Sequence, residues 1–136
     1  MPKIGQRHRQ GPTPCSDATS TPPTAPPRPA PIPRRSSRTL YLSGQVGVGA
    51  DGQVPEDATA QARLVWANIQ AQLRAAGMTL DNLVKITTIL PNHADLAATR
   101  VARTEALGER KPASTLIIGG LASPAWKIEI EAIAYA

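Results

Sequence analysis

The sequence predicts an α+β fold in which two helices pack on one face of a single sheet. Some stretches alternate in polarity or are rich in β-branched residues, as strands are, and two stretches carry apolar side chains at helical spacing. Their order along residues 39–136 is strand, helix, strand, helix, strand, strand, which is typical of this layered arrangement. A segment of this length, in a chain with two Trp, two Tyr and no Phe, builds a small core. We therefore expect oligomerisation to complete its burial.

A strand and a long helix are predicted in the first half of this segment. Residues 39–48 alternate in polarity, which predicts a strand with one apolar face. Asp51-Gly52 is a typical turn pair and separates this strand from the helix. Over residues 57–76 apolar side chains recur at helical spacing, and Gly77 stands where a left-handed glycine commonly ends a helix. The expected apolar faces consist of Leu40, Leu42, Val46 and Val48 in the strand and of Ala62, Val65, Trp66, Ile69, Leu73 and Ala76 in the helix.

A second strand and helix come next in the chain. Residues 83–90 are rich in β-branched side chains, and Pro91 marks the end of this strand. Asp95 is a candidate N-cap for a helix that reaches Leu107, with Gly108 after its last turn. The second half thus begins with the same strand and helix order as the first.

Two strands close the chain, over residues 113–118 and 126–135. In the last strand Glu129 and Glu131 alternate with isoleucines, so both carboxylates point to the face opposite the isoleucines. If solvent covers that face, the two glutamates are ordinary surface residues. If an oligomer interface covers it, they become buried acids whose pKa the interface can tune.

The first 38 residues differ in composition from the rest. They hold 10 of the 14 prolines and carry a net charge of +6, whereas residues 39–136 carry −1. A basic chain suggests a nucleic-acid or membrane partner, but here the charge belongs to a segment too rich in proline to fold alone. Within it, residues 19–35 contain Ile32 as their one large aliphatic side chain, which predicts a loop. The chain is therefore divided into a Pro/Arg-rich segment, 1–38, and a folded domain, 39–136.

Several classes of protein are disfavoured by what the sequence lacks. No stretch approaches the roughly 18 apolar residues of a membrane span, and no apolar core of a secretory signal is visible. Cys15 has no partner for a disulfide or a zinc site, and His8 and His93 have no ligand-spaced partners. An Arg- and Ser-rich leader suggests an organellar transit segment, but its prolines are incompatible with the amphipathic helix needed. We expect a cytoplasmic protein with no metal site and no membrane partner, in which His93 is a solvated loop residue.

Short motifs spread over residues 39–136 carry a family resemblance. They are Leu40-Tyr41-Leu42-Ser43-Gly44-Gln45-Val46, Gln61 to Ile69, Ala75-Ala76-Gly77-Met78, Val84-Lys85-Ile86-Thr87-Thr88, Asp95-Leu96-Ala97, Pro112-Ala113 and Lys127-Ile128-Glu129-Ile130-Glu131-Ala132-Ile133-Ala134. In order and spacing they resemble the Rid/YjgF family of reactive-intermediate deaminases, also described as endoribonuclease L-PSP-like. The resemblance implies a fold like chorismate mutase of the trimeric type. Three sheets would pack into a barrel-like homotrimer with a ligand cleft at each subunit interface.

The resemblance also implies an activity and its site. The deaminating branch hydrolyses enamine or imine intermediates, released by pyridoxal-phosphate enzymes, to a 2-keto acid and ammonia, and it uses no cofactor. Glu129 matches a cleft position and would act as the catalytic residue through a water, while Ser43 would bind substrate. In that branch an arginine after Pro-Ala clamps the substrate carboxylate, and Ser114 occupies the matching position. Leu116 corresponds to a frequent cysteine, and Arg100 to a cleft asparagine.

These departures leave more than one function open. Losing a charged anchor costs about 1.5 to 3 kcal/mol, so hydrolysis of 2-aminoacrylate is predicted to be weak unless Arg100 replaces the clamp. The leading hypothesis is a homotrimer that acts on a small metabolite by enamine or imine hydrolysis. The alternative is a non-catalytic ligand-binding or regulatory trimer. Endoribonuclease activity is less favoured, because residues 39–136 are close to neutral and offer few aromatics for base stacking.

The N-terminal segment departs from the family as well. Gly11-Pro12, followed by Ser16, resembles the usual entry into the fold, but the interval from Ser16 to Ser43 is longer than in the family. A loop inserted at residues 19–35 accounts for the extra length. A shifted reading frame or a misassigned start would produce a similar composition.

Overall fold

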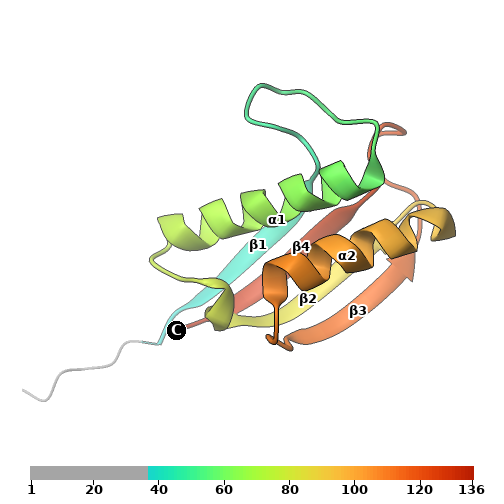
Figure 1. The fold of residues 1–136 in the computed structure, drawn as a ribbon. Helices are drawn as coiled ribbons and strands as arrows, with labels where there is room; N and C mark the ends of the chain where they lie inside the picture. The colour runs from blue at the N-terminus through green and yellow to red at the C-terminus, as the bar shows by residue number, and fades with distance from the viewer. Residues whose placement is uncertain (1–36) are drawn as a thin grey trace, which may run out of the picture. The chain divides into compact units, whose positions relative to one another are not determined.

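The structure is a computed structural model and describes residues 37–136 (Figure 1). The family-like entry and the inserted loop predicted at 19–35 lie outside the described residues. Two α-helices, four strands and two short 3-10 helices follow one another in the predicted order. Their bounds are β1 (Thr39–Val46), α1 (Ala58–Ala75), η1 (Leu80–Asn82), β2 (Leu83–Leu90), η2 (His93–Asp95), α2 (Leu96–Leu107), β3 (Ala113–Ile118) and β4 (Glu129–Tyr135).

The four strands form one mixed sheet in the order β1-β4-β2-β3. β4 pairs antiparallel with both β1 and β2, while β2 and β3 are parallel neighbours joined through α2. The last strand therefore lies between the first two, and β3 is an edge strand. The sheet thus presents β1 and β3 as its two edges.

Both helices cover the same face of the sheet, as the sequence predicts (Figure 1). The core lies between them and the sheet, where Ile69, Leu73, Ile86 and Leu90 are fully buried. Trp66 adds the largest buried side chain. No helix packs on the opposite face of the sheet in the described part of the chain, and we call this second surface the open face (Figure 1).

Both ends of α1 have defined caps. At the first turn the Asp57 carboxylate accepts a hydrogen bond from the Ala60 amide at 2.7 Å. At the other end Gly77 has φ +69°, and the Met78 amide donates to the Leu73 carbonyl at 2.8 Å. This is the glycine-terminated arrangement that the sequence predicts.

The cap predicted for the second helix is wrong. Asp95 already has helical backbone angles and makes no capping hydrogen bond with its side chain. Three residues earlier, Asn92 accepts from the Ala94 amide and begins the short helix η2, which leads directly into α2. The chain thus becomes helical before Asp95, because the Asn92 side chain already accepts the hydrogen bond of the free Ala94 amide. At the far end Gly108 has φ +54°, as expected of a residue that ends a helix.

The apolar face predicted for the first strand is wrong beyond Leu42. The register with β4 shifts by one residue between Leu42 and Gln45, which is a β-bulge. The extra residue reverses the alternation, so Gly47 is buried while Val46 pairs with Glu129. The strand also ends at Val46 rather than at residue 48.

The last strand begins at Glu129 rather than at residue 126. Just before it, the Ala125 carbonyl accepts from the Gln61 side chain at 2.9 Å, and the Lys127 amide donates to the same side chain at 2.8 Å. The backbone of this stretch therefore bonds to an amide side chain instead of to a neighbouring strand.

Candidate functional site

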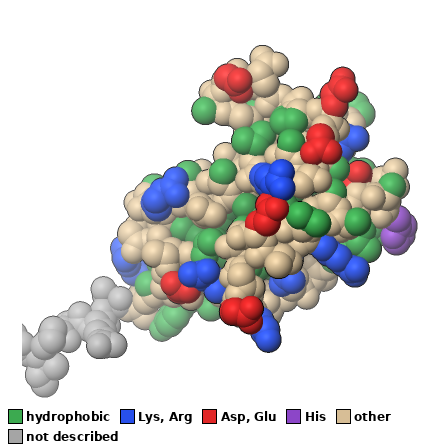
Figure 2. All heavy atoms as spheres, in the orientation of Figure 1, with side chains coloured by type: hydrophobic (Ala, Val, Ile, Leu, Met, Phe, Trp, Pro, Cys, Tyr) green, Lys and Arg blue, Asp and Glu red, His purple; other side chains and the backbone are tan. Residues whose placement is uncertain are grey.

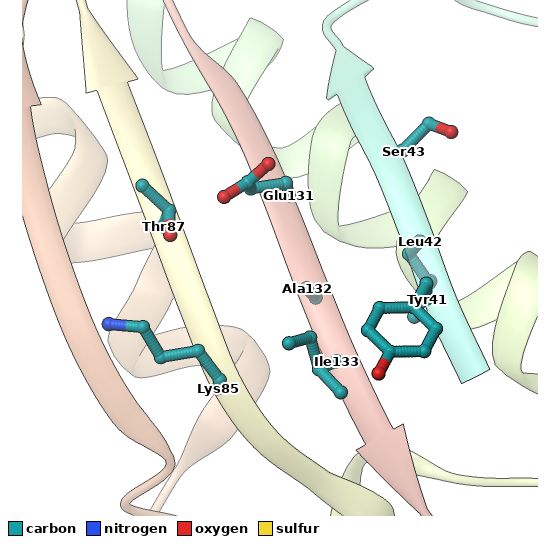
Figure 3. A pocket seen from close by; sticks show the side chains of 8 residues that line it. All are labelled: Tyr41, Leu42, Ser43, Lys85, Thr87, Glu131, Ala132 and Ile133. Carbon is teal, nitrogen blue, oxygen red and sulfur yellow. The ribbon is translucent and has the colours of Figure 1, made fainter. Parts of the chain in front are cut away.

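A hollow of about 440 Å³ lies on the open face of the sheet (Figure 3). Its polar side chains come from three neighbouring strands, and Figure 3 shows them on the viewer's side of the ribbon. The hollow is open to solvent in the single chain. It is lined by Tyr41, Leu42, Ser43, Lys85, Thr87, Glu131, Ala132 and Ile133.

The β-bulge brings backbone and acid together at one border of this hollow. Because of the register shift, Ser43 and Gly44 both stand opposite Glu131. The Glu129 carboxylate lies against Gly44, since a Cβ placed on that glycine would be 1.8 Å from Glu129 Oε1. A glycine is thus required for the acid to approach the bulge this closely. Two of the predicted site residues, Ser43 and Glu129, are therefore neighbours on the open face.

Charges of both signs occur around the hollow. The Lys85 ammonium donates a hydrogen bond to the Thr115 hydroxyl of β3. Figure 3 shows the Glu131 carboxylate turned toward Thr87 on the adjacent strand. Of the two acids, Glu131 is exposed and Glu129 is half-buried.

The other two predicted site residues lie elsewhere. Ser114 pairs with Ile86, whose side chain is fully buried under the helices, so Ser114 belongs to the helix-covered side of the sheet. The next residue, Thr115, contacts Lys85 on the open face, as strand alternation requires. Arg100 is exposed on α2. Within one chain the sheet therefore separates Ser114 and Arg100 from Glu129.

A buried glutamine holds the loops next to the bulge, and the sequence analysis missed it. Gln61 is fully buried and donates to the Pro55 carbonyl at 2.7 Å, in addition to its two bonds with Ala125 and Lys127. On the next turns of α1, Asn68 donates to the Val46 and Val48 carbonyls, each at 3.2 Å. The sequence does contain a signal for this role, because Gln61 lies on the apolar face of α1, where a buried polar side chain needs hydrogen-bond partners.

Two ion pairs join elements within residues 37–136, and both lie away from the hollow. Arg63 of α1 pairs with Glu105 of α2 at 2.8 Å, and its hydrogen bond lowers the pKa of that carboxyl while the pKa of Arg63 rises. Arg110 pairs with Asp81 at 2.6 Å, and this hydrogen bond lowers the pKa of Asp81. All four groups are solvent-exposed, so these pairs contribute little to stability.

In the described part of the chain, no three His, Cys, Asp or Glu side chains lie close enough together to hold a metal ion. His93 is exposed, as expected.

The architecture and sequence match known proteins. The family model described as Endoribonuclease L-PSP matches residues 33–136. Protein mmf2, mitochondrial, of Schizosaccharomyces pombe is 37% identical over 103 residues, which cover 74% of this chain and 82% of that protein. The 2-iminobutanoate/2-iminopropanoate deaminase of Capra hircus is 34% identical over 99 residues, 71% of this chain and 72% of that enzyme. The crystal structure of RidA from an Antarctic Psychrobacter superposes with a TM-score of 0.68 at 32% identity, covering 72% of this chain and 80% of the other.

These matches and the two-helix, four-strand fold define the class of protein. The chain belongs to the Rid/YjgF family, the one whose family model is described as Endoribonuclease L-PSP.

The cellular location stays a prediction. Two relatives from Schizosaccharomyces pombe are named as mitochondrial, so the comparisons do not confirm a cytoplasmic location. Within residues 37–136 no helix is both long and apolar enough to cross a bilayer.

Proposed function

We propose that this chain forms a homotrimer that hydrolyses a small 2-imino or 2-enamine acid at its subunit interfaces. The observation that carries the proposal is the Glu129 carboxylate held against the Ser43-Gly44 bulge on the open face. Relatives named 2-iminobutanoate/2-iminopropanoate deaminase, 34% identical in Capra hircus and in Escherichia coli, support the reaction class.

The proposed chemistry needs a positioned water and a proton carrier. A 2-enamine acid first tautomerises to the imine, with a proton leaving the nitrogen and a proton added to the terminal carbon. Water then adds to the imine carbon and its oxygen becomes the keto oxygen, while the C–N bond breaks and ammonia leaves. Glu129 orients this water and, through it, protonates the departing nitrogen. The Ser43 hydroxyl and the backbone of the bulge bind the substrate and the charge that develops on it. No cofactor takes part in this scheme.

A complete site requires residues from two protomers. Ser114 lies on the helix-covered side of β3, whereas Glu129 lies on the open face of β4. A cleft that contains both therefore combines Ser114 of one protomer with Glu129 of its neighbour. Arg100 lies on α2, on the same side of the sheet as Ser114, so it is a candidate guanidinium for such a cleft.

The edge strand β3 supports the trimer. Every residue of β3 is exposed, and the apolar side chains Leu116, Ile117 and Ile118 retain 43%, 46% and 37% of their accessible surface. One edge of β3 also has no neighbouring strand. An apolar strand edge of this kind favours association, and a second copy of the chain would cover it.

The activity is tested with 2-aminoacrylate generated in situ by a dehydratase, whose decay is followed by absorbance. Wild type should accelerate the decay, Glu129→Gln should abolish the acceleration, and Ser114→Arg should raise the rate by about 10- to 150-fold, because a charged anchor is worth about 1.5 to 3 kcal/mol. Arg100→Ala tests whether this arginine already serves as the clamp. If neither wild type nor Ser114→Arg exceeds the uncatalysed decay, the proposed reaction is wrong.

The oligomer is tested by light scattering and sedimentation. Wild type should be a trimer at micromolar concentration, and Ile117→Lys should dissociate it by placing a charge on the β3 surface. Val101→Lys is the matched control, because Val101 is 49% exposed on α2, away from the sheet edge. A monomeric wild type would contradict the shared cleft.

A non-catalytic ligand-binding trimer is the second candidate. It is favoured by Ser114 at the position of the clamp and by the E. coli TdcF structure with bound serine, which is 28% identical with a TM-score of 0.69. Saturable binding of an amino acid or keto acid without hydrolysis by any variant would support it. RNA cleavage has less support, since acidic and basic side chains are interspersed on the face shown in Figure 2.

A further inference from the structure

Gln61 is the fully buried polar side chain whose hydrogen bonds reach furthest along the sequence. Its Nε2 donates to the Pro55 carbonyl at 2.7 Å and to the Ala125 carbonyl at 2.9 Å, and its Oε1 accepts from the Lys127 amide at 2.8 Å. Both amide donors are used, as is the acceptor. The side chain therefore joins α1 to the two loops that flank the bulge.

The loop between β3 and β4, which contains Ala125 and Lys127, leads into β4, the strand that begins with Glu129. Between β3 and β4, the chain has few other hydrogen bonds: Gly119 donates to Leu90, and Ser123 closes a tight turn through bonds from Ala125 and Trp126. Lys127 stands two residues before Glu129, so its bond to Gln61 fixes the direction in which β4 begins.

The other loop follows β1, the strand that contains the bulge. Pro55 lies in the segment between β1 and α1, which Gln61 fastens to the start of the helix. Gly47, three residues after Gly44, lies so close to α1 that a Cβ there would be 2.5 Å from Gln61 Cβ. One residue of α1 thus contacts the exit of β1 and the entrance of β4, the two strands that hold Ser43 and Glu129.

We propose that Gln61 is a positioning residue for the site: its buried amide sets the relative placement of the Ser43-Gly44 bulge and the Glu129 carboxylate. Its consequence for catalysis rests on the proposed function, but the placement itself does not. Gln61 does not touch the hollow, so it acts through the two loops rather than on the substrate.

The test replaces Gln61 by methionine, which has similar length and no amide. Gln72→Met is the matched control, because Gln72 is exposed on the same helix. The readout that is independent of activity is the chemical shift of the Gly44 amide in NMR spectra, which the Glu129 carboxylate perturbs because it lies against Gly44. The Glu129-dependent part is the difference between each protein and the same protein carrying Glu129→Gln. We expect this difference in wild type and in Gln72→Met, and we expect Gln61→Met to lose most of it.

The kinetic arm separates positioning from a general loss of stability. Gln61→Met should lower kcat by about 10- to 100-fold with little change in KM, since a small misplacement of a catalytic group has an effect of this size. If Gln61→Met does not fold, Gln61→Asn takes its place. Asparagine keeps the amide but is one methylene too short to reach the Pro55, Ala125 and Lys127 backbone groups together, so the Glu129-dependent part of the Gly44 signal should again be lost.

The outcomes distinguish the two proposals. A wild type without hydrolysis, together with a Gly44 signal that depends on Gln61, would end the proposed function and support the positioning role. A full Glu129-dependent shift in Gln61→Met, or an unchanged kcat after that shift is lost, would overturn the positioning role. In Gln61→Asn, a full Glu129-dependent shift would do the same.

Discussion

Replacing Gly44 by alanine is predicted to damage the site while sparing the fold. In the described chain the glycines at positive φ are at other positions, so Gly44 needs no left-handed backbone. The added Cβ would be 1.8 Å from Glu129 Oε1, 2.6 Å from its Cδ and 2.9 Å from its Cγ. Ordinary carbon contacts are about 3.5 to 4 Å, so the carboxylate has to move by well over 1 Å.

The two effects of this change differ in size. Moving the half-buried Glu129 side chain out of its preferred rotamer costs about 0.5 to 1.5 kcal/mol, which the reduced freedom of the unfolded chain partly offsets. We therefore expect the melting temperature of Gly44→Ala to change by no more than about 5 °C. Hydrolysis should fall by about 10- to 100-fold, because the acid is no longer against the bulge.

Two other glycines supply the controls for Gly44→Ala. At Gly47 a Cβ would meet the Cβ and the Cα of Gln61 at 2.5 and 2.7 Å, and helix backbone cannot move aside, so Gly47→Ala should lose about 1 to 3 kcal/mol or more. At Gly120 an added Cβ would have no atom within 4 Å, so Gly120→Ala should change neither the melting temperature nor the rate of hydrolysis. Calorimetry and the absorbance assay measure both. Full activity in Gly44→Ala would refute the role given to the Glu129 carboxylate.

Three further predictions concern the rest of the chain. Deleting residues 19–35 should leave the oligomer and its melting temperature nearly unchanged, and a loss of folding would show that the segment is integral to the domain. Gly77→Ala should cost about 1 to 2 kcal/mol by calorimetry, since φ is +69° and an added Cβ finds its nearest neighbour at 3.9 Å, so that backbone strain alone acts. Because Arg63 and Arg110 lower the pKa of Glu105 and Asp81, the two ion pairs make a small contribution to stability above the unfolded-state pKa values, and this contribution is lost as the pH falls below about 4. Urea titrations of Glu105→Gln should therefore show a weaker dependence on acid pH than wild type, and an unchanged dependence would contradict this assignment.

Local sequence signals predicted the elements whose ends they mark. β2 and β3 have the predicted bounds, because Pro91 follows one and Gly119-Gly120 follows the other. Gly77 ends α1 for the same reason, since its own conformation decides the cap. In each case the determinant lies within a residue or two of the boundary.

Two of the errors occur where a distant residue decides the local structure, whereas the wrong cap at Asp95 was decided locally by Asn92. Alternation in the sequence continues through Ser43-Gly44, and the bulge exists only because β4 pairs across it with one residue fewer. The late start of β4 depends on Gln61, more than sixty residues away in the chain. The residue pattern within one strand gives no information on its pairing with β4 or on the hydrogen bond from Lys127 to Gln61.

The assignment of the site residues stays a prediction, and the fold shows on which face of the sheet each of them lies. Family-like motifs select Ser43 and Glu129, which the fold brings together, and Ser114 and Arg100, which it places across the sheet. Which face of the sheet Ser114 occupies depends on its register with β2, and the sequence contains no measure of register. The cleft at the subunit interface was expected only from the family resemblance, and it stays a prediction.

The central place of β4 has a consequence for how the chain acquires its structure during synthesis. A ribosome releases β1, α1, β2, α2 and β3 before the strand that joins β1 to β2. Until those last residues emerge, β1 and β2 expose the edges that β4 will occupy, and such edges promote aggregation. Folding of the sheet therefore depends on a late pairing between distant parts of the chain, which is intrinsically slow. A frameshift or premature stop before Glu129 would remove the strand that joins β1 to β2, even though both helices and the other three strands would already have been made.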